Sequence, residues 1–525
     1  LAEGMNTYWY ANATRFIPYT IHEFPGYSFV VSDVHGHVLS IPFVLLAIAM
    51  LINMAIRDKQ EARSKTEPLS YFSPISYHLS LIFYGFLVGV LLMTNALDGP
   101  IYLGLLVVVL GVQSAKCKVQ SVKTVGIQLV IVIGAAILTS LPFLVYFKSF
   151  VTGLAVNCPL GFLANTKYGP LIFEGVEKCQ VSPLWMWWLL WGFFIYCGVG
   201  LLIKNLQIYK PALPAGRSTN LQINLPILPK IKILKSNSSQ TEQLLFLFFL
   251  FSLALVIFPE FLYFKDIYPM HFRSNTMFKL GYQAFILFSI VAGYTIVKTA
   301  TGDTREVISR RKRFLLRRLF FIFLLPQLLL VSIFPIFAVR SYFGALKKYE
   351  GIYGLNWLAR EYPDDWRAIE WLKKAISEKR EARSENQSKN ASFLSPITYR
   401  LSPVLVEADG DSYTDYARFS AFTGIPTIVG WPVHEWLWRG TYDVVAPRRE
   451  EVRQIYESED REVTRMILVK YGVRYVIVGS LEREKYKRLT EGKFTQPQFS
   501  ETGAGFRQLG REVFRSGDTV IYRIQ

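Results

Sequence analysis

An aspartate and two histidines occupy alternate positions, Asp33, His35 and His37, directly before a long apolar run. In an extended backbone all three side chains would point the same way and could bind a divalent metal such as Mg²⁺ or Mn²⁺. In a helix, Asp33 and His37 would share a face and His35 would point elsewhere. An aspartate here can also simply cap the helix. Glu23 precedes a proline-bounded turn and can form a carboxylate pair with Asp33, so these two acids are the candidate catalytic groups.

Two further polar stretches stand beside apolar runs. In "TNALDGP" (94–100), Asp98 is typical of a tight turn that it caps, with a proline in the first turn of the next helix. In "DIYPMHFRSNTMFKLGYQ" (266–283), Arg273, Asn275 and Lys279 crowd the start of another run. These cations could hold a substrate phosphate by charge-assisted hydrogen bonds or could contact lipid headgroups.

The stretch "GWPVHEWLWRG" (430–440) combines three tryptophans with His434, Glu435 and Arg439. Such aromatic side chains could stack on a sugar ring, rest on a membrane interface or form an ordinary core. The stretch follows a predicted strand, and ligand loops of α/β domains lie at the carboxyl ends of strands.

Eight apolar runs must position these residues. Most of them reach the ~20 residues that cross a hydrocarbon core, and 51% of the 525 residues are hydrophobic, so we predict an α-helical polytopic membrane protein. The chain begins at Leu1 in mid-motif, and we expect further N-terminal spans to precede it. The runs are 38–56, 79–95, 100–114, 125–147, 183–203, 243–263, 280–298 and 319–339.

The formal net charge of +18 comes from basic residues whose placement along the chain indicates membrane topology, so we expect no nucleic-acid partner. Alternate connections are poor in basic residues: only Arg15 lies within 1–37, and 94–100 has none. The positive-inside rule makes the basic-rich connections cytoplasmic, so the candidate residues share the outer face of the plasma membrane. The basic-rich connections are 57–65, 114–124, 204–242 and 298–318.

After Arg340 the composition changes, which predicts a membrane domain over 1–340 and a small extracytoplasmic α/β domain over 341–525. Short buried strands are predicted at 403–408, 427–430, 474–479 and 519–524, with helices at 449–457 and 460–471. Cys158 and Cys179 share one predicted outer loop, and a disulfide between them is a hypothesis.

Several long motifs together resemble the YYY-type (Chlor_Arch_YYY) membrane proteins of archaea and some bacteria. That family has no known function and is related to the GT-C superfamily of membrane glycosyltransferases. The resemblance runs from Glu23 to about Tyr486. The motifs are "EFPGYSFVVSDVHGHVLSIPFVLLAIA", "TNALDGP", "RSNTMFKLGYQA", "GIPTIVGWPVHEWLWRG" and "YGVRYVIVG".

The resemblance implies an outward-facing site that takes polyprenyl-phosphate-linked sugars, with acids in the loops between spans and, in some members, a divalent metal. It implies that Glu23 and Asp33 are the acids, while His35 and His37 match paired histidines that the family separates by proline instead of Gly36. The superfamily's main acid follows its first span, a region that we expect upstream of Leu1. The implied substrate-binding residues are Asn95, Asp98, Arg273, Asn275, Lys279, His434, Glu435, Trp438 and Arg439.

The predicted function is therefore transfer of a sugar from a polyprenyl-phosphate donor to an unknown acceptor at the outer membrane face. The alternative is a non-catalytic envelope or lipid-binding protein, which would have the same spans and caps. Convergence of the acids and cations at one place would favour the enzyme, and scattered positions would favour the scaffold. A transporter is disfavoured because the runs are nearly free of charged residues.

Overall fold

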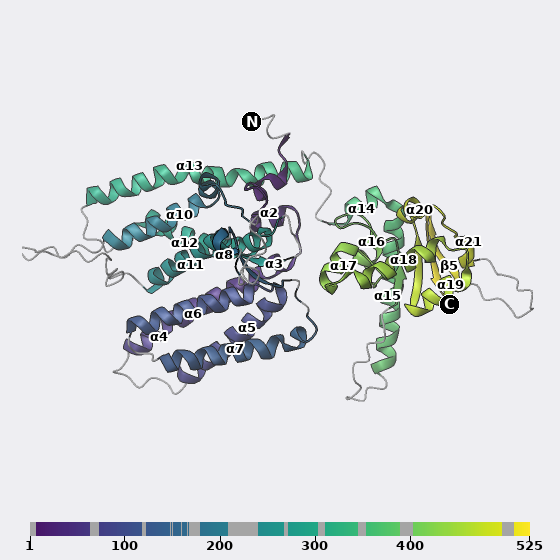
Figure 1. Cartoon of the computed structure of the whole chain (residues 1–525), viewed down its shortest axis with the longest axis horizontal. Helices are drawn as coiled ribbons and strands as arrows, with labels where there is room; N and C mark the ends of the chain where they lie inside the picture. Colours follow the sequence, from purple (N-terminus) through teal and green to yellow (C-terminus); the bar gives the residue numbers. More distant parts are fainter. Residues whose placement is uncertain are drawn as a thin grey trace, which may run out of the picture. The chain divides into compact units, whose positions relative to one another are not determined.

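The computed structural model describes residues 7–63, 73–117, 122–147, 149, 151–158, 160–164, 166, 179–207, 240–266, 271–302, 310–344, 353–388, 403–495 and 509–524. The chain divides into two compact units (Figure 1). Unit 1 comprises residues 1–147 and 151–347, and unit 2 comprises residues 348–525 with 148–150.

Unit 1 contains, among the described residues, seven helices that are long and apolar enough to cross a membrane. The eighth expected run forms a shorter apolar helix over Asp98–Ser114. The predicted polytopic architecture is therefore confirmed, with the 100–114 run as its shortest member. The long spans are Gly36–Ile56, Tyr77–Thr94, Val122–Leu144, Leu184–Ile203, Gln240–Phe261, Ser274–Thr301 and Phe314–Phe343.

The helices of unit 1 pack in two groups (Figure 1). The first group is α4 (Ile41–Arg63), α5 (Ser73–Thr94), α6 (Asp98–Cys117) and α7 (Val122–Leu144). The second is α10 (Leu184–Gln207), α11 (Gln240–Phe261), α12 (Ser274–Thr301) and α13 (Arg310–Phe343). Helix α11 contacts α4 and α6 and so joins the two groups through one continuous apolar core.

Two glycines allow α5 and α7 to approach closely. A Cβ atom added at Gly85 would lie 2.4 Å from the carbonyl oxygen of Val132, and one at Gly89 would lie 2.8 Å from that of Ala136. The two glycines are four residues apart and therefore share one helix face. Small residues at this spacing let two membrane helices pack backbone to backbone.

Helix α13 differs from the other spans because only 6% of its most apolar window is buried. It contacts α10 and two short segments, η1 (Tyr10–Thr14) and α2 (Pro25–Val30). Its many exposed leucine and phenylalanine side chains suit contact with lipid, since lipid tails are as apolar as leucine.

Short elements connect the spans at one end of unit 1. Strands β1 (Gly153–Val156) and β2 (Leu262–Lys265) pair antiparallel, and the helices α3 (Gly36–Leu39) and α8 (Gly161–Ala164) are single turns. Cys158 and Cys179 form a disulfide, which confirms the hypothesis drawn from their shared loop.

Unit 2 is a mixed α/β domain built on a four-stranded sheet of order β3-β4-β6-β5. Strands β3 (Val404–Val406) and β4 (Val473–Val478) are parallel, while β6 (Thr519–Ile524) pairs antiparallel with β4 and with β5 (Gly510–Ser516). The small α/β architecture is therefore confirmed. The strand predicted at 427–430 is wrong, because the chain bends after Thr427 and contacts the sheet there through one isolated bridge to Leu405.

Helices cover both faces of this sheet, because alternate side chains of β4 enter two separate apolar clusters. Val476 and Val478 pack with α18 (Val445–Glu457) and α19 (Arg461–Lys470), whereas Tyr475 and Ile477 pack with α15 (Pro363–Ser388). The remaining elements are α14 (Asn356–Glu361), α16 (Arg418–Thr423), α17 (Pro432–Arg439), η2 (Tyr442–Val444), α20 (Ser480–Lys485) and α21 (Gly492–Thr495).

Candidate functional site

The chain before α4 folds so that Glu23, Asp33 and His37 meet. Helix α2 begins at Pro25, which suits the first helical position, and ends in a turn where the backbone N–H of Asp33 donates to the carbonyl of Ser28. The next helix, α3, starts directly after His35. This turn brings Asp33 back toward Glu23 and toward the first residues of the span.

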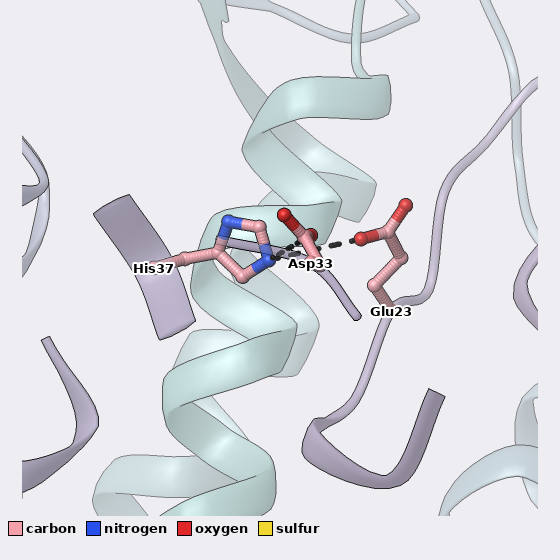
Figure 2. Close-up of side chains that lie close together, drawn as sticks. All are labelled: Glu23, Asp33 and His37. Atoms are coloured by element: carbon pink, nitrogen blue, oxygen red, sulfur yellow. Dashed lines mark ion pairs between the residues drawn. The ribbon is translucent and has the colours of Figure 1, made fainter. Parts of the chain in front are cut away.

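His37 directs its Nε2 atom at both carboxylates (Figure 2). Nε2 lies 3.2 Å from Asp33 Oδ2 and 3.8 Å from Glu23 Oε2. The side chain is buried, and Nε2 makes no hydrogen bond with any part of the chain that the structure describes. One ligand atom from each of the three residues lies within 4.8 Å of the other two, a grouping that can hold a metal ion.

Of the predicted metal set Asp33, His35 and His37, the structure places Asp33 and His37 in the group but not His35. His35 bonds to Asp33 Oδ1, through both its ring Nδ1 and its backbone N–H, and its side chain is exposed. It therefore approaches the aspartate from outside the group, and Glu23 takes the third position beside Asp33 and His37.

The electrostatics of the two acids differ. Burial opposes ionisation of Asp33, but the hydrogen bonds from His35 and the adjacent His37 imidazole outweigh it and hold the Asp33 pKa well below its usual range. Burial raises the pKa of Glu23, which the nearby His37 and Arg15 only partly offset. The Asp33 bond in turn raises the pKa of His35. Asp33 is thus a stable anion, whereas burial makes Glu23 the weaker acid of the two.

A second network lies against the first and contains three of the predicted substrate-binding residues. Lys279 Nζ donates to Asn95 Oδ1 at 2.7 Å, and Asn95 Nδ2 donates to Asp98 Oδ1 at 2.8 Å. Gln283, one turn after Lys279, also donates to Asp98 Oδ1 at 2.9 Å. Asn95, Asp98 and Gln283 are buried, and these bonds satisfy Asp98 Oδ1, whereas Asp98 Oδ2 has no hydrogen-bond partner within the described residues.

Helix α12 and Gly36 join the two networks. The rings of Phe278 and Tyr282 pack edge-on against His37, on either side of Lys279 in the sequence. A Cβ atom at Gly36 would lie 2.1 Å from the carbonyl oxygen of Thr94, so only glycine fits between the two histidines. The acids, His37 and Lys279 therefore lie at one end of the span bundle.

Arg273 and Asn275 have partners of their own. The Arg273 side chain is almost fully buried, with Nη1 2.8 Å from Glu260 Oε2 and Nη2 donating to Ser182 at 3.1 Å. Asn275 donates to Asp266 at 2.8 Å. The pairing of Arg273 holds the start of α12 to the end of α11, and its predicted contact with phosphate stays a prediction.

The predicted residues of unit 2 stabilise α17 and its flanking turn. Glu435 accepts the backbone N–H of Gly430 at 2.9 Å and pairs with Arg439, one turn later. His434 Nδ1 lies 2.7 Å from the hydroxyl of Ser412. The side chain of the fourth residue, Trp438, is outside the described part of the chain.

Three contributors to the site were not expected from the sequence. Arg15 lies 3.8 Å from Glu23 Oε1, on the side away from His37. The sequence distinguished Arg15 in one way: it is the only lysine or arginine within residues 1–37. Gln283 and Tyr282 carried a weaker signal, because polar side chains within an apolar span are costly unless they have a partner.

Comparison with curated proteins and with solved structures finds no match. The model of one family, DUF2298, described as an uncharacterized membrane protein, matches residues 1–288 and so covers all of the acids, histidines and cations gathered at this end of unit 1. Because this match spans more than half of the chain and agrees with the multiple spans of unit 1, the protein is an integral membrane protein that belongs to the DUF2298 family.

Proposed function

We propose that the protein is a membrane glycosyltransferase of the GT-C type, which transfers a sugar from a polyprenyl-phosphate donor to an acceptor at the outer face. The observation that carries the proposal is the convergence of Glu23, Asp33 and His37 beside Lys279 at one end of the spans. A non-catalytic scaffold gives no reason to gather two acids, an imidazole and a cation in one buried place.

The residues fit a divalent metal. Two carboxylates and one imidazole are suitable ligands, and the buried Nε2 of His37 lacks a hydrogen bond within the described residues. The imidazole favours Mn²⁺ over Mg²⁺, since Mg²⁺ prefers an all-oxygen shell. A bound ion would supply charge stabilisation to the donor phosphate.

The chain's own residues account for proton transfer and charge. Glu23 accepts the proton of the acceptor hydroxyl at Oε1, the oxygen near Arg15, and keeps Oε2, the oxygen near His37, as its ligand atom. The acceptor oxygen forms a bond to the anomeric carbon as the bond from that carbon to the phosphate oxygen breaks, and the electron pair leaves with the phosphate. Lys279 is oriented by Asn95 and uses one of its three N–H donors within the described residues, so that with Arg15 it can stabilise the developing charge.

The outer location of the site is supported by the disulfide. Cys158 and Cys179 are cross-linked next to the β1–β2 sheet, and structural disulfides persist in oxidising compartments. Glu260 and Arg273, at the ends of α11 and α12, belong to the same end of unit 1, since Asn157 hydrogen-bonds to the Glu260 carbonyl.

The test is sugar transfer by the full-length protein in native-like membranes, with radiolabelled polyprenyl-phosphate mannose, glucose and N-acetylglucosamine and with Mn²⁺ present. Asp33→Ala and His37→Ala are expected to lower the rate at least 100-fold, about 2.7 kcal/mol of transition-state stabilisation. His78→Ala is the matched control, because His78 is an exposed histidine at the other end of α5. Undiminished transfer by Asp33→Ala would remove Asp33 from the mechanism, and a wild-type protein inactive with every donor would contradict the function.

A further inference from the structure

Three aromatic rings of unit 2 meet where two neighbouring extended segments end. Strand β3 forms a parallel bridge from Leu405 to Thr427, so the chain after β3 and the chain after residue 429 emerge at the same edge. Tyr413 follows the first segment, and Trp431 and His434 follow the second. Their ring centroids lie 5.3–5.7 Å from one another. Ligands of α/β domains bind beyond the carboxyl ends of parallel strands.

Hydrogen bonds fix two of the rings in place. The indole N–H of Trp431 donates to the carbonyl of Tyr416 at 3.1 Å. The Nδ1 atom of His434 lies 2.7 Å from the hydroxyl of Ser412. The cluster is therefore preorganised, with a hydroxyl and an imidazole beside the aromatic faces.

Tyr413 is held in an unfavourable conformation and left exposed. Its φ is +63°, in the left-handed region that a residue with a side chain enters at a steric cost, and 74% of its surface is accessible. Neither of the two apolar clusters that pack on the sheet includes this ring. A strained, exposed aromatic residue outside the core indicates a functional constraint.

We infer that Tyr413, Trp431 and His434 form a binding platform for a neutral saccharide. The apolar C–H face of a pyranose ring can stack on such rings, while its hydroxyls bond to polar groups at the edge. The exposed charges nearest to Tyr413 in the sequence are acids, Asp411 and Asp415. These acids disfavour acidic sugars and the anionic headgroups of a bilayer, and they are compatible with uncharged hydroxyls. The inference goes beyond the proposed function, since saccharide binding needs neither a metal nor a lipid phosphate.

The experiment measures binding of cellotetraose, mannotetraose and chitotetraose to the full-length protein in nanodiscs by calorimetry. We expect at least one of these neutral saccharides to bind, and Tyr413→Gly to weaken that binding at least tenfold. Glycine adopts φ +63° without a steric cost, so the unfolding temperature of this variant is expected not to fall. Tyr442→Ala removes another exposed aromatic ring, and its affinity should stay unchanged.

Two outcomes would overturn the inference: no binding of any of the three saccharides, or equal binding by wild type and Tyr413→Gly. Asp33→Ala separates this proposal from the proposed function, because it should abolish sugar transfer and leave saccharide affinity intact. The tryptophans of the span Leu184–Ile203 are quenched by brominated lipids in every variant. An additional part of the quenching that is lost in Trp431→Phe would instead assign the rings to the bilayer surface and would also overturn the inference.

Discussion

At the scale of single residues, one buried nitrogen of His37 lies opposite two carboxylates. This arrangement predicts how much each residue contributes to the affinity for a metal ion. We predict that Glu23→Gln and His37→Ala each weaken Mn²⁺ binding at least 100-fold, since each removes a ligand atom. His35→Ala should cost only about tenfold, because His35 orients Asp33 from outside the group. Titration of Mn²⁺ followed by electron paramagnetic resonance measures all three, and a larger loss for His35→Ala than for Glu23→Gln would contradict the ligand set.

The buried Glu407 makes the free energy of unfolding of unit 2 depend on pH. Its carboxylate is fully buried, and burial raises its pKa to about 7 despite hydrogen bonds from the N–H groups of Phe419 and Ser420. Below about pH 4.5 the group is protonated in both the folded and the unfolded state. As pH rises from there, the unfolded chain releases the proton first, so the free energy of unfolding falls by about 3 kcal/mol until pH passes 7.

Glu407→Gln should therefore flatten this decline between pH 4.5 and 7, whatever its effect on stability at a single pH. Pulse proteolysis of the full chain in urea, followed on fragments from residues 403–495, gives the free energy at each pH. Glu459→Gln is the control, because Glu459 is exposed and should leave the decline unaltered. An equally steep decline in both variants would show that another group titrates.

At the scale of helices, the contact between α5 and α7 depends on two glycines. Gly85→Ala puts a methyl group 2.4 Å from a carbonyl oxygen of α7, and we predict a loss of about 1–3 kcal/mol from overpacking. Gly134→Ala on α7 is the matched control, since its added Cβ meets no heavy atom within 4 Å. Thermal unfolding in detergent compares the two, and equal midpoints would contradict the close packing.

The spans were predictable because each is a self-contained signal: about 20 apolar residues must be helical when no water can satisfy the backbone. The sheet of unit 2 was mostly predictable for a similar reason, since its buried strands are short apolar runs. Strand β5, with the polar sequence "GREVFRS", and the β1–β2 pair were not expected. The β1–β2 pair joins two four-residue segments that lie far apart in the sequence, and β5 is a partly exposed strand at the edge of its sheet.

The candidate site was likewise predictable where it depends on local spacing and not where it depends on distant partners. The approach of Asp33 to His37 followed from spacing, and its pairing with Glu23 was a hypothesis from residue type. The third member of the ligand group depended on the turn after α2, which no local pattern gives. The Glu260 partner of Arg273 likewise comes from another helix, so the sequence offered no means of distinguishing a buried ion pair from a phosphate ligand.

At the scale of the whole molecule, the orientation of both units relative to the membrane can be tested by thiol labelling. In a Cys117→Ser background, Val34→Cys and Val469→Cys introduce exposed thiols in units 1 and 2, and Thr301→Cys introduces one at the opposite end of α12. The remaining native cysteines are cross-linked or buried. The positive-inside rule predicts that the basic-rich end is cytoplasmic. An impermeant maleimide should therefore label the first two in intact cells and the third only after permeabilisation.

Labelling of Val34→Cys and Val469→Cys from opposite sides would place the candidate site and the saccharide platform in different compartments. The outer-face location proposed for one of the two would then be wrong, although each binding measurement would still stand alone.

The bond between Cys158 and Cys179 has a practical consequence for production of the protein. It closes a loop with a sequence separation of 21 residues. By lowering the conformational entropy of the unfolded chain, such a loop stabilises the folded state by roughly 3 kcal/mol. A preparation made in a reducing cell-free mixture, or purified with a strong thiol reagent, would lack this cross-link beside the Glu260–Arg273 pair. Hosts with an oxidising export pathway, and buffers free of reductant, are therefore the conditions under which activity should be sought.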